Sequence, residues 1–195
     1  FESSSGFREA FARLFGTAPS RSGGVHCLFA KWIDSPLGAI LALADDDGLH
    51  VFDWVDRRGL EREIVRLRTR TKCAIVPGSH AALAQAEKEI GEYFAGSRTT
   101  FSLPLATRGT EFQRQVWQQL LQIPAGETRS YADIARSLGA PKSVRAVARA
   151  NGDNFRGIII PCHRVIGSDG SLTGYGGGLA RKQWLLDHER RAVGS

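Results

Sequence analysis

The 195-residue chain contains no methionine, three cysteines and no long hydrophobic run. Because Phe1 rather than methionine begins the sequence, we expect the chain to be part of a longer protein. Cys27, Cys73 and Cys162 are odd in number and widely spaced, which argues against a disulfide framework and favours free thiols in a reducing compartment. No apolar run approaches the ~20 residues that span a bilayer, and no signal-peptide pattern opens the chain. We therefore predict a soluble, cytoplasmic monomer with no membrane partner.

The positive charge is unevenly distributed along the chain. Residues 1–100 contain 13 basic and 13 acidic residues, whereas residues 101–195 contain 13 basic and 7 acidic residues. The second half therefore accounts for the whole net charge of +6. A polyanion is expected to bind there, although a basic, solvated face without a partner would have the same composition.

Hydrophobic periodicity and turn residues divide the chain into an N-terminal helix, a linker, an α/β part and a mainly helical part. The corresponding ranges are 1–19, 20–25, 26–105 and 106–195. Predicted strands are 27–33, 37–43, 49–54 and 73–76; predicted helices are 3–16, 58–69, 81–94, 110–121, 131–138, 143–150 and 180–190. The tight turn at 139–142 is typical of a helix-turn-helix. The α/β part contains no titratable cluster typical of a site, so its predicted role is structural.

Cys162 is the strongest candidate for a reactive residue. A thiol attacks as the thiolate, and neighbouring cations lower its pKa from ~8.5. His163 and Arg164 follow Cys162 directly, and Pro161 restricts the backbone before it. The isoleucines at 158–160 predict a buried strand that holds the thiol in a fixed place. A Cys-His pair alone is more often a buried structural cysteine beside an incidental histidine, so the functional interpretation depends on the surrounding motifs.

Those motifs occur in one consistent register on both sides of Cys162. They comprise Pro161-Cys162-His163-Arg164-Val165, together with Phe112-Gln113, Val116-Trp117, Leu120, Ile123-Pro124, Gly126, Thr128, Ser130-Tyr131, Ile134-Ala135, Arg145-Ala146-Val147, Asn154, Tyr175, Gly178 and Trp184-Leu185-Leu186. In order and spacing they resemble the O6-alkylguanine-DNA alkyltransferase family, densely over 105–190 and more loosely over 27–104. The resemblance implies an RNase H-like N-terminal α/β domain followed by a winged-helix-like DNA-binding methyltransferase domain.

The resemblance also implies a reaction and assigns roles to single residues. Cys162 would take the alkyl group from O6-alkylguanine, and from O4-alkylthymine, in double-stranded DNA, without a cofactor and in one irreversible turnover. Glu189 would hold His163 in the required tautomer, and His163 would take the thiol proton through a water. Tyr131 would donate a proton to the leaving guanine, and Asn154 would buttress the turn beneath the cysteine.

Recognition of the base is implied to take place from the minor groove, with the damaged nucleotide flipped into a pocket. Arg145 would fill the gap in the base stack, and the small Ala146 would let its helix approach the backbone. Arg149 stands where the family usually has a small residue, and it would either grip a phosphate or point away. Lys142 and Tyr131 complete the predicted DNA-binding set. Bound to DNA, a bacterial protein of this kind would be associated with the nucleoid.

Tyr175, Gly176, Gly177 and Val165 are implied to line the pocket. Some bacterial relatives carry a bulky tryptophan where Gly177 stands. We therefore predict a roomy pocket that accepts O6-benzylguanine.

Two further features concern the N-terminal half. Residues 1–19 resemble the end of an AraC-type helix-turn-helix domain, which implies an Ada-like adaptive-response regulator, although any amphipathic helix would share much of the pattern. His26, Cys27, Cys73 and His80 include the residue types of a Cys2His2 zinc site, but their spacing does not follow a compact zinc motif. No metal is predicted.

Three alternative functions share some of these features. A DNA lesion sensor that binds without repairing would lack the acceptor cysteine, which is present here as Cys162. A Cys-His thiol hydrolase needs an oxyanion hole that no motif provides, and it leaves the positive charge unexplained. A regulator that uses Cys162 mainly as a damage signal shares the chemistry and differs in its additional domains.

Overall fold

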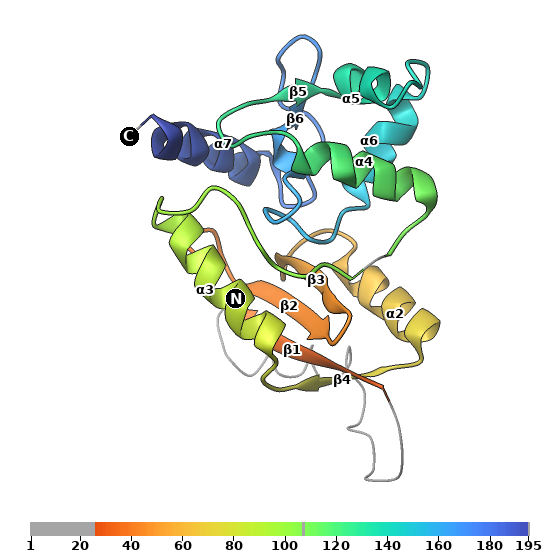
Figure 1. Ribbon diagram of the computed structural model, residues 1–195, viewed down its shortest axis with the longest axis vertical. Coiled ribbons are helices and arrows are strands. Elements are labelled where there is room, and N and C mark those ends of the chain that lie inside the picture. The colour runs from red at the N-terminus through yellow and green to blue at the C-terminus, as the bar shows by residue number, and fades with distance from the viewer. Residues whose placement is uncertain (1–25, 107, 195) are drawn as a thin grey trace.

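The computed structural model describes residues 26–106 and 108–194 of the chain. The predicted helix over 3–16 and the AraC-type resemblance over 1–19 lie outside the described residues. Two domains are stacked along the long axis, with a sheet and its helices below and a helical layer above (Figure 1). None of the described helices combines the length and apolar character needed to cross a membrane.

The N-terminal domain is built on a four-stranded sheet with the order β3-β2-β1-β4. Its strands are β1 (Cys27–Ile33), β2 (Ile40–Asp45), β3 (Gly48–Trp54) and β4 (Ala74–Pro77). The first three form an antiparallel meander, and β4 runs parallel to β1. Strand β2 starts three residues later than predicted, because a turn closed by the Gly38 N–H and the Ser35 carbonyl precedes it.

Helices α2 (Leu60–Thr71) and α3 (Ala81–Phe94) cover opposite faces of this sheet (Figure 1). Successive side chains of a strand point to opposite faces of the sheet, and those of β2 are hydrophobic on both faces, so each face has to be covered by a helix. Ile40 and Ala42 pack into the core on the α3 side, whereas Leu41 and Leu43 pack into the core on the α2 side. The mixed α/β architecture predicted for residues 26–105 is therefore present.

The C-terminal domain consists mainly of helices around one hydrophobic core. Its elements are α4 (Glu111–Leu121), β5 (Arg129–Ser130), α5 (Tyr131–Ser137), α6 (Val144–Gly152), the 3-10 helix η1 (Cys162–Arg164), β6 (Val165–Ile166) and α7 (Leu179–Val193). Thr110 caps α4 as predicted, and Ser130 caps α5; each side chain accepts a hydrogen bond from the backbone three residues on. Helices α5 and α6 follow each other across a short turn, in agreement with the predicted helix-turn-helix.

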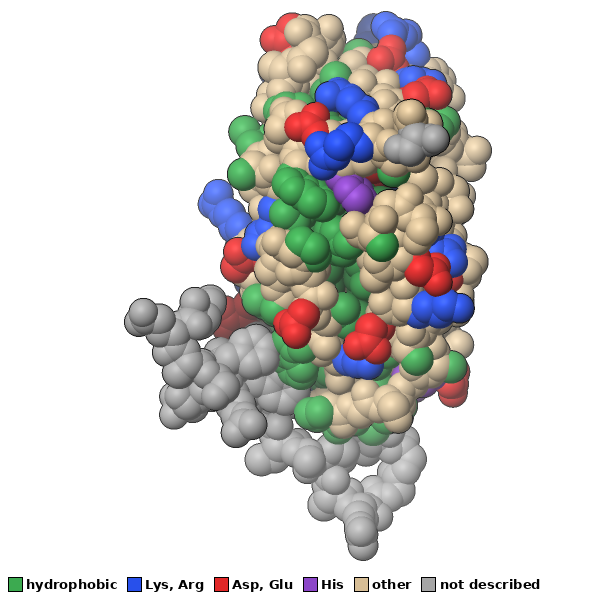
Figure 2. Space-filling model, turned by 90° about the vertical axis from the view of Figure 1, so that its left-hand side faces the viewer, with side chains coloured by type: hydrophobic (Ala, Val, Ile, Leu, Met, Phe, Trp, Pro, Cys, Tyr) green, Lys and Arg blue, Asp and Glu red, His purple; other side chains and the backbone are tan. Residues whose placement is uncertain are grey.

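The two domains meet along the edge strand β3 and along α3. The Phe52 N–H of β3 donates to the Phe155 carbonyl at 2.8 Å, so the segment leading to Cys162 pairs with the N-terminal sheet. On the side of the molecule where α3 and α7 lie, hydrophobic side chains gather in a shallow hollow (Figure 2). Contacts of Phe94 with Trp184 and of Tyr93 with His188 join the two helices there.

The prediction of a strand before Cys162 is wrong. Residues 157–160 form a buried turn, in which the Ile160 N–H donates to the Arg156 carbonyl at 2.9 Å. Ile158 has a φ of 66°, a left-handed conformation that is rare and costly for a β-branched residue. All three isoleucines are buried, so their hydrophobicity reflects burial between the domains and not pairing in a sheet.

Candidate active site

Cys162 opens the short helix η1 and is buried beneath a pocket of about 450 Å³. Both domains line this pocket. The lining residues are Asp53, Arg57 and Arg58 from the N-terminal domain, and Tyr131, Ala148, Asn151, Gly152, Asn154, Cys162, Thr173, Gly174, Tyr175, Gly176 and Gly177 from the C-terminal domain. The structure thus brings together predicted residues from α5, from the segment after α6, from η1 and from the glycine-rich loop.

The two residues that follow Cys162, His163 and Arg164, form a buried ionic network with Glu189. The Glu189 Oε1 atom accepts from His163 Nε2 at 2.8 Å and from Arg164 Nη2 at 2.8 Å, and Glu189 Oε2 accepts from Arg164 Nε at 2.9 Å. Glu189 is 1% exposed and His163 is 0% exposed, so water does not screen the pair. The predicted partnership of His163 and Glu189 is therefore formed by helix α7 packing against η1.

The protonation states of this network follow from burial and hydrogen bonding. Burial alone would raise the pKa of Glu189, but hydrogen bonds from His163 and Arg164 outweigh it and hold that pKa well below its usual range. Burial lowers the pKa of His163, although Glu189 acts in the opposite direction. An ionised carboxylate can only accept, so Nε2 of neutral His163 carries the proton and Nδ1 keeps a lone pair. Nδ1 is buried and has no hydrogen-bond partner among the described residues.

The expected lowering of the thiol pKa by adjacent cations is not observed. Burial raises the pKa of Cys162 above its usual value, and a hydrogen bond to Asn154 and the charges of Arg57 and Lys182 compensate only in part. The Arg164 guanidinium is bonded to Glu189 and to the Ile123 carbonyl, and not to the thiol. At neutral pH Cys162 is therefore a thiol that needs a base.

Two asparagines hold the backbone around the thiol. The Asn154 Nδ2 atom donates to the Ile160 carbonyl at 2.9 Å, and its Oδ1 accepts from the Arg156 N–H at 3.0 Å. Asn151 Nδ2 lies 3.4 Å from the Cys162 carbonyl. The Asn154 side chain therefore bonds the backbone at both ends of the turn at 157–160, which is the position predicted for it.

The remaining predicted pocket residues differ in their placement. The Tyr131 hydroxyl lies 3.3 Å from the Thr173 carbonyl, at the entrance formed by the glycine-rich loop. Tyr175 and Gly176 line the pocket. The prediction that Val165 lines the pocket is wrong. Its side chain is fully buried in the C-terminal core, because residue 165 pairs with Arg129 between β6 and β5.

Gly177 lines the pocket, but the lack of a side chain at this position does not by itself make the pocket larger. A Cβ atom built on Gly177 would lie 2.8 Å from the Trp54 ring. The space that a side chain at 177 would need is therefore already occupied by a tryptophan from the N-terminal domain. The size of the pocket depends on the loop backbone and on Trp54 together.

The predicted DNA-contacting residues lie on the exposed face of α6 and in the turn before it. Arg145, Ala146, Arg149 and Lys142 are all exposed, and the three basic side chains form no hydrogen bond or ion pair with residues 26–106 or 108–194. On the other face of α6, Val147 and Ala150 are buried in the core. Because Ala148 lines the pocket, this exposed face borders the entrance to Cys162.

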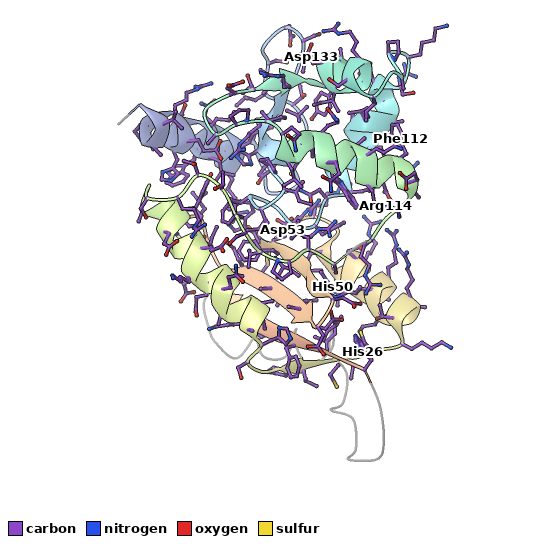
Figure 3. All side chains as sticks on the ribbon, in the orientation of Figure 1. His26, His50, Asp53, Phe112, Arg114 and Asp133 are labelled. Carbon is purple, nitrogen blue, oxygen red and sulfur yellow. The ribbon has the colours of Figure 1, made fainter. Side chains whose placement is uncertain are left out.

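Sequence reasoning missed the contribution of the N-terminal domain. Asp53 lies at the junction of the two domains (Figure 3), and Arg57 Nη1 donates to it at 2.5 Å. Arg57 also donates to the carbonyls of Asn154 at 2.5 Å and Gly152 at 2.6 Å, at the end of α6. A Cβ on Gly176 would collide with this guanidinium, so the glycine permits Arg57 to reach these carbonyls. Burial raises the pKa of Asp53 to about 6, although Arg57 acts against the shift.

Two more buried groups near the site carried no recognisable sequence signal. The Tyr93 hydroxyl, from α3, donates to Glu189 Oε1 at 2.9 Å. Lys182, on α7, is fully buried and donates to the carbonyls of Val165 and Thr173 at 2.5 and 2.7 Å. Burial lowers the pKa of Lys182 to about 8. Both are long-range contacts that local patterns do not reveal.

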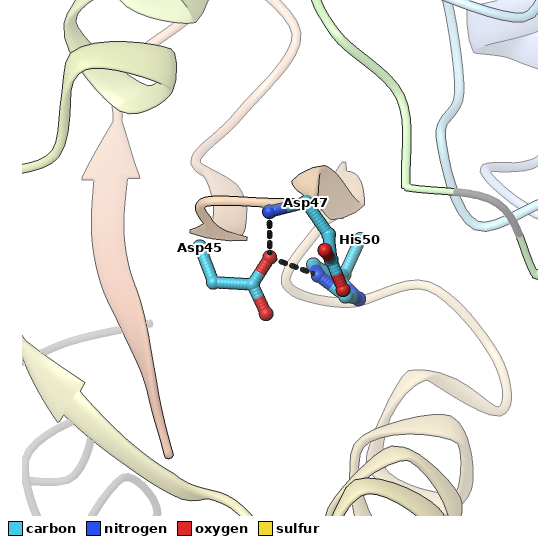
Figure 4. Close-up of side chains that lie close together, drawn as sticks. All are labelled: Asp45, Asp47 and His50. Carbon is cyan, nitrogen blue, oxygen red and sulfur yellow. Dashed lines mark hydrogen bonds and ion pairs between the residues drawn. The ribbon is translucent and has the colours of Figure 1, made fainter.

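Farther down the N-terminal domain, Asp45, Asp47 and His50 form a compact group (Figure 4). Asp45 accepts from His50 Nε2 at 2.6 Å, from His26 Nε2 at 2.7 Å and from the Asp47 N–H at 2.9 Å. Arg108 Nε donates to His50 Nδ1 at 3.1 Å. The oxygens of Asp45 and both nitrogens of His50 are thus engaged, and we interpret the group as a hydrogen-bond network. The residues considered for zinc are also engaged elsewhere, His80 with Asp46 and Cys73 with Thr71.

Two family profiles match the chain. One, described as "6-O-methylguanine DNA methyltransferase, ribonuclease-like domain", matches residues 28–107, and the other, described as "6-O-methylguanine DNA methyltransferase, DNA binding domain", matches residues 111–191. Their order confirms the predicted fold class.

Individual relatives agree with these profiles. The chain is 48% identical over 161 residues to a methylated-DNA–protein-cysteine methyltransferase of Mycolicibacterium paratuberculosis, covering 83% of this chain and 92% of that one. It is 44% identical over 163 residues to a constitutive enzyme of the same name from Bacillus subtilis, with 80% and 92% covered. The crystal structure of Mycobacterium tuberculosis OGT in complex with DNA matches with a TM-score of 0.71 and 42% identity, covering 85% and 94%.

Proposed function

Since the chain belongs to the 6-O-methylguanine DNA methyltransferase family, and so is a methylated-DNA–protein-cysteine methyltransferase of DNA repair, we propose that Cys162 is the cysteine that accepts the alkyl group. The observation that carries the proposal is the position of Cys162 beneath the shared pocket, adjacent in the sequence to His163, which is buried and paired with Glu189. The substrate is O6-alkylguanine in double-stranded DNA, and O4-alkylthymine as a second base.

The proposed reaction begins with a proton transfer. Nδ1 of His163 takes the proton of the Cys162 thiol through a water molecule, and Glu189 stabilises the imidazolium that forms. The thiolate then attacks the alkyl carbon, so the S–C bond forms while the C–O6 bond breaks. Tyr131 donates its hydroxyl proton to the leaving guanine, and the proton held by His163 restores the tyrosine. The products are neutral guanine and a thioether on Cys162, which ends the activity of that molecule.

Access to the thiol requires the damaged nucleotide to leave the duplex, because Cys162 is buried and the alkylated base is stacked. We place α6 in the minor groove, with Arg145 filling the vacated position and Ala146 against the backbone. Unstacking costs a few kcal/mol, which contacts from the exposed basic residues of α6 and of the turn before it would offset.

The test is the intact mass of the protein after incubation with a duplex that contains one O6-methylguanine. The wild type should gain one methyl group, mapped to Cys162 by peptide analysis, and Cys162→Ala should gain none. Cys73→Ala is the matched control, since Cys73 is also buried but lies in the N-terminal domain. Methylation of Cys162→Ala, or tight binding of the lesion without any gain in mass, would contradict the proposal.

A further inference from the structure

Four arginines follow one another at four-residue intervals: Arg58 lies two residues before helix α2, and Arg62, Arg66 and Arg70 lie on the helix itself. We call Arg58, Arg62, Arg66 and Arg70 the α2 arginine stripe; all four are exposed. Residues four apart lie on the same face of a helix, and like charges at this spacing destabilise an isolated helix by about 0.2–0.5 kcal/mol per pair. The stripe therefore has an energetic cost within the helix.

Little in the structure neutralises this stripe. Arg66 forms an ion pair with Glu63 at 3.1 Å, but Arg58, Arg62 and Arg70 form no hydrogen bond or ion pair within the described part of the chain. The acidic residues that line the same hollows as the stripe are Asp53, which is paired with Arg57, and Glu63 and Asp153. The stripe thus keeps an excess of positive charge, although the N-terminal half of the chain has no net charge overall.

The stripe is continuous with the active site. Arg58 lines the Cys162 pocket itself. Arg58, Arg62 and Arg66 line a neighbouring hollow of about 350 Å³ together with Gly152 and Asp153, at the end of α6. Arg66 and Arg70 line the next depression with Arg108. The positive side chains therefore run from the entrance of the pocket along the N-terminal domain.

We propose that the α2 arginine stripe binds backbone phosphates of the same DNA duplex, on one flank of the extruded nucleotide. The twelve residues of α2 extend over about 18 Å, and phosphates follow each other every ~3.4 Å of axis along one strand, so several are within reach of the stripe. The proposal rests on the proposed function, because it takes α6 and the Cys162 pocket as the centre of the DNA-binding face. It gives the N-terminal domain a direct role in substrate binding.

The experiment compares two double variants on a duplex with one O6-methylguanine that is long enough for only one protein molecule. Arg62→Gln/Arg70→Gln removes two unpaired stripe residues that do not line the Cys162 pocket. Lys31→Gln/Lys88→Gln removes two positive charges next to α3, on the opposite face of the sheet. Affinity is measured over a range of salt concentrations, and methyl transfer is measured in single turnover.

Each phosphate contact contributes about 0.9 to the slope of log K against log salt. The stripe variant should therefore lower the slope by about 2 and weaken binding at low salt at least tenfold. Its transfer rate constant at saturating duplex should equal that of the wild type, and the control variant should change neither slope nor rate. An unchanged slope in the stripe variant, or an equal decrease in the control, would overturn the proposal. If the wild type fails to transfer methyl at all, the proposed function fails, while the salt slopes still decide whether the stripe contacts DNA.

Discussion

The two domains contribute to the site in different ways. The C-terminal domain supplies the candidate reacting groups, and Cys162 and His163 are adjacent in the sequence. The N-terminal domain supplies Asp53, Arg57 and Tyr93, which lie far from Cys162 in the sequence and contact the site only through folding. A short motif can therefore reveal the chemistry of this protein, whereas the contacts that hold it in place appear only in three dimensions.

The two domains also differ in the pKa of a buried carboxylate: that of Glu189 in the C-terminal domain is lowered, and that of Asp53 in the N-terminal domain is raised. Glu189 accepts hydrogen bonds from His163, Arg164 and Tyr93, and its pKa lies well below the usual range because these donors outweigh burial. Asp53 accepts from Arg57 and from the Trp54 N–H, and burial outweighs them, so that its pKa rises to about 6. The number and charge of the donors decide the sign of each shift.

Loss of the Glu189 carboxylate should have the largest effect. In Glu189→Gln, Arg164 becomes a buried cation without a counter-ion, which costs about 3–5 kcal/mol of stability. His163 also loses the acceptor that fixes its tautomer, so we expect the methyl-transfer rate to fall by about 10²–10⁴. Urea unfolding and single-turnover transfer measure the two effects. Glu127→Gln, at an exposed position, is the control and should change neither; equal rates for Glu189→Gln and the wild type would show that the pair does not act in transfer.

Arg57→Met tests whether the N-terminal domain supports the site to a similar extent. It leaves Asp53 buried without its cation and the carbonyls of Gly152 and Asn154 without donors. We expect a loss of stability of about 3 kcal/mol and slower transfer, because Asn154 and the end of α6 lose their tie to the sheet. Arg57→Lys should recover part of the rate by keeping the charge, and Lys88→Met on α3 should leave both quantities unchanged. A normal transfer rate in Arg57→Met would reduce the N-terminal domain to a purely structural role.

The opposite pKa shifts predict opposite dependences of stability on pH. Asp53 has a raised pKa in the folded state, so its contribution is fully present below 3.8 and is lost as the pH rises through about 6. Glu189 and His163 have lowered pKa values, so their contributions are present above about 4.5 and 6.5 and are lost as the pH falls. Asp53→Asn removes the first contribution alone. Its free energy of unfolding relative to the wild type should therefore improve by about 1–3 kcal/mol between pH 4.5 and pH 7.5, as measured in urea. A constant difference would mean that Asp53 keeps an ordinary pKa in the folded protein.

The sequence predicted the elements where local signals are strong and missed features that depend on distant contacts. The capped helix α4 and helix α3, with its regular apolar face, lie where they were expected. The isoleucines at 158–160 predict a strand but form a turn, because a run of buried β-branched residues has the same composition in a strand and in a turn enclosed by two domains. Arg57 and Tyr93 have no motif of their own, and only the packing of the sheet and α3 against the C-terminal domain brings them to the site.

Tyr93→Phe should produce the smallest effect and sharpens the comparison most. The substitution keeps the ring in contact with Phe94, Phe101 and His188, and it removes only the hydroxyl that donates to Glu189. Because Glu189 retains His163 and Arg164 as donors, we expect the free energy of unfolding, measured by urea denaturation, to fall by about 1–2 kcal/mol. The methyl-transfer rate should change only a few-fold. Ser97→Ala, which removes an exposed hydroxyl just after α3, is the control and should change neither quantity. If Tyr93→Phe slowed transfer as much as Glu189→Gln, the hydroxyl from the N-terminal domain would itself set the state of the His163–Glu189 pair, and the division between reacting and supporting domains would no longer hold.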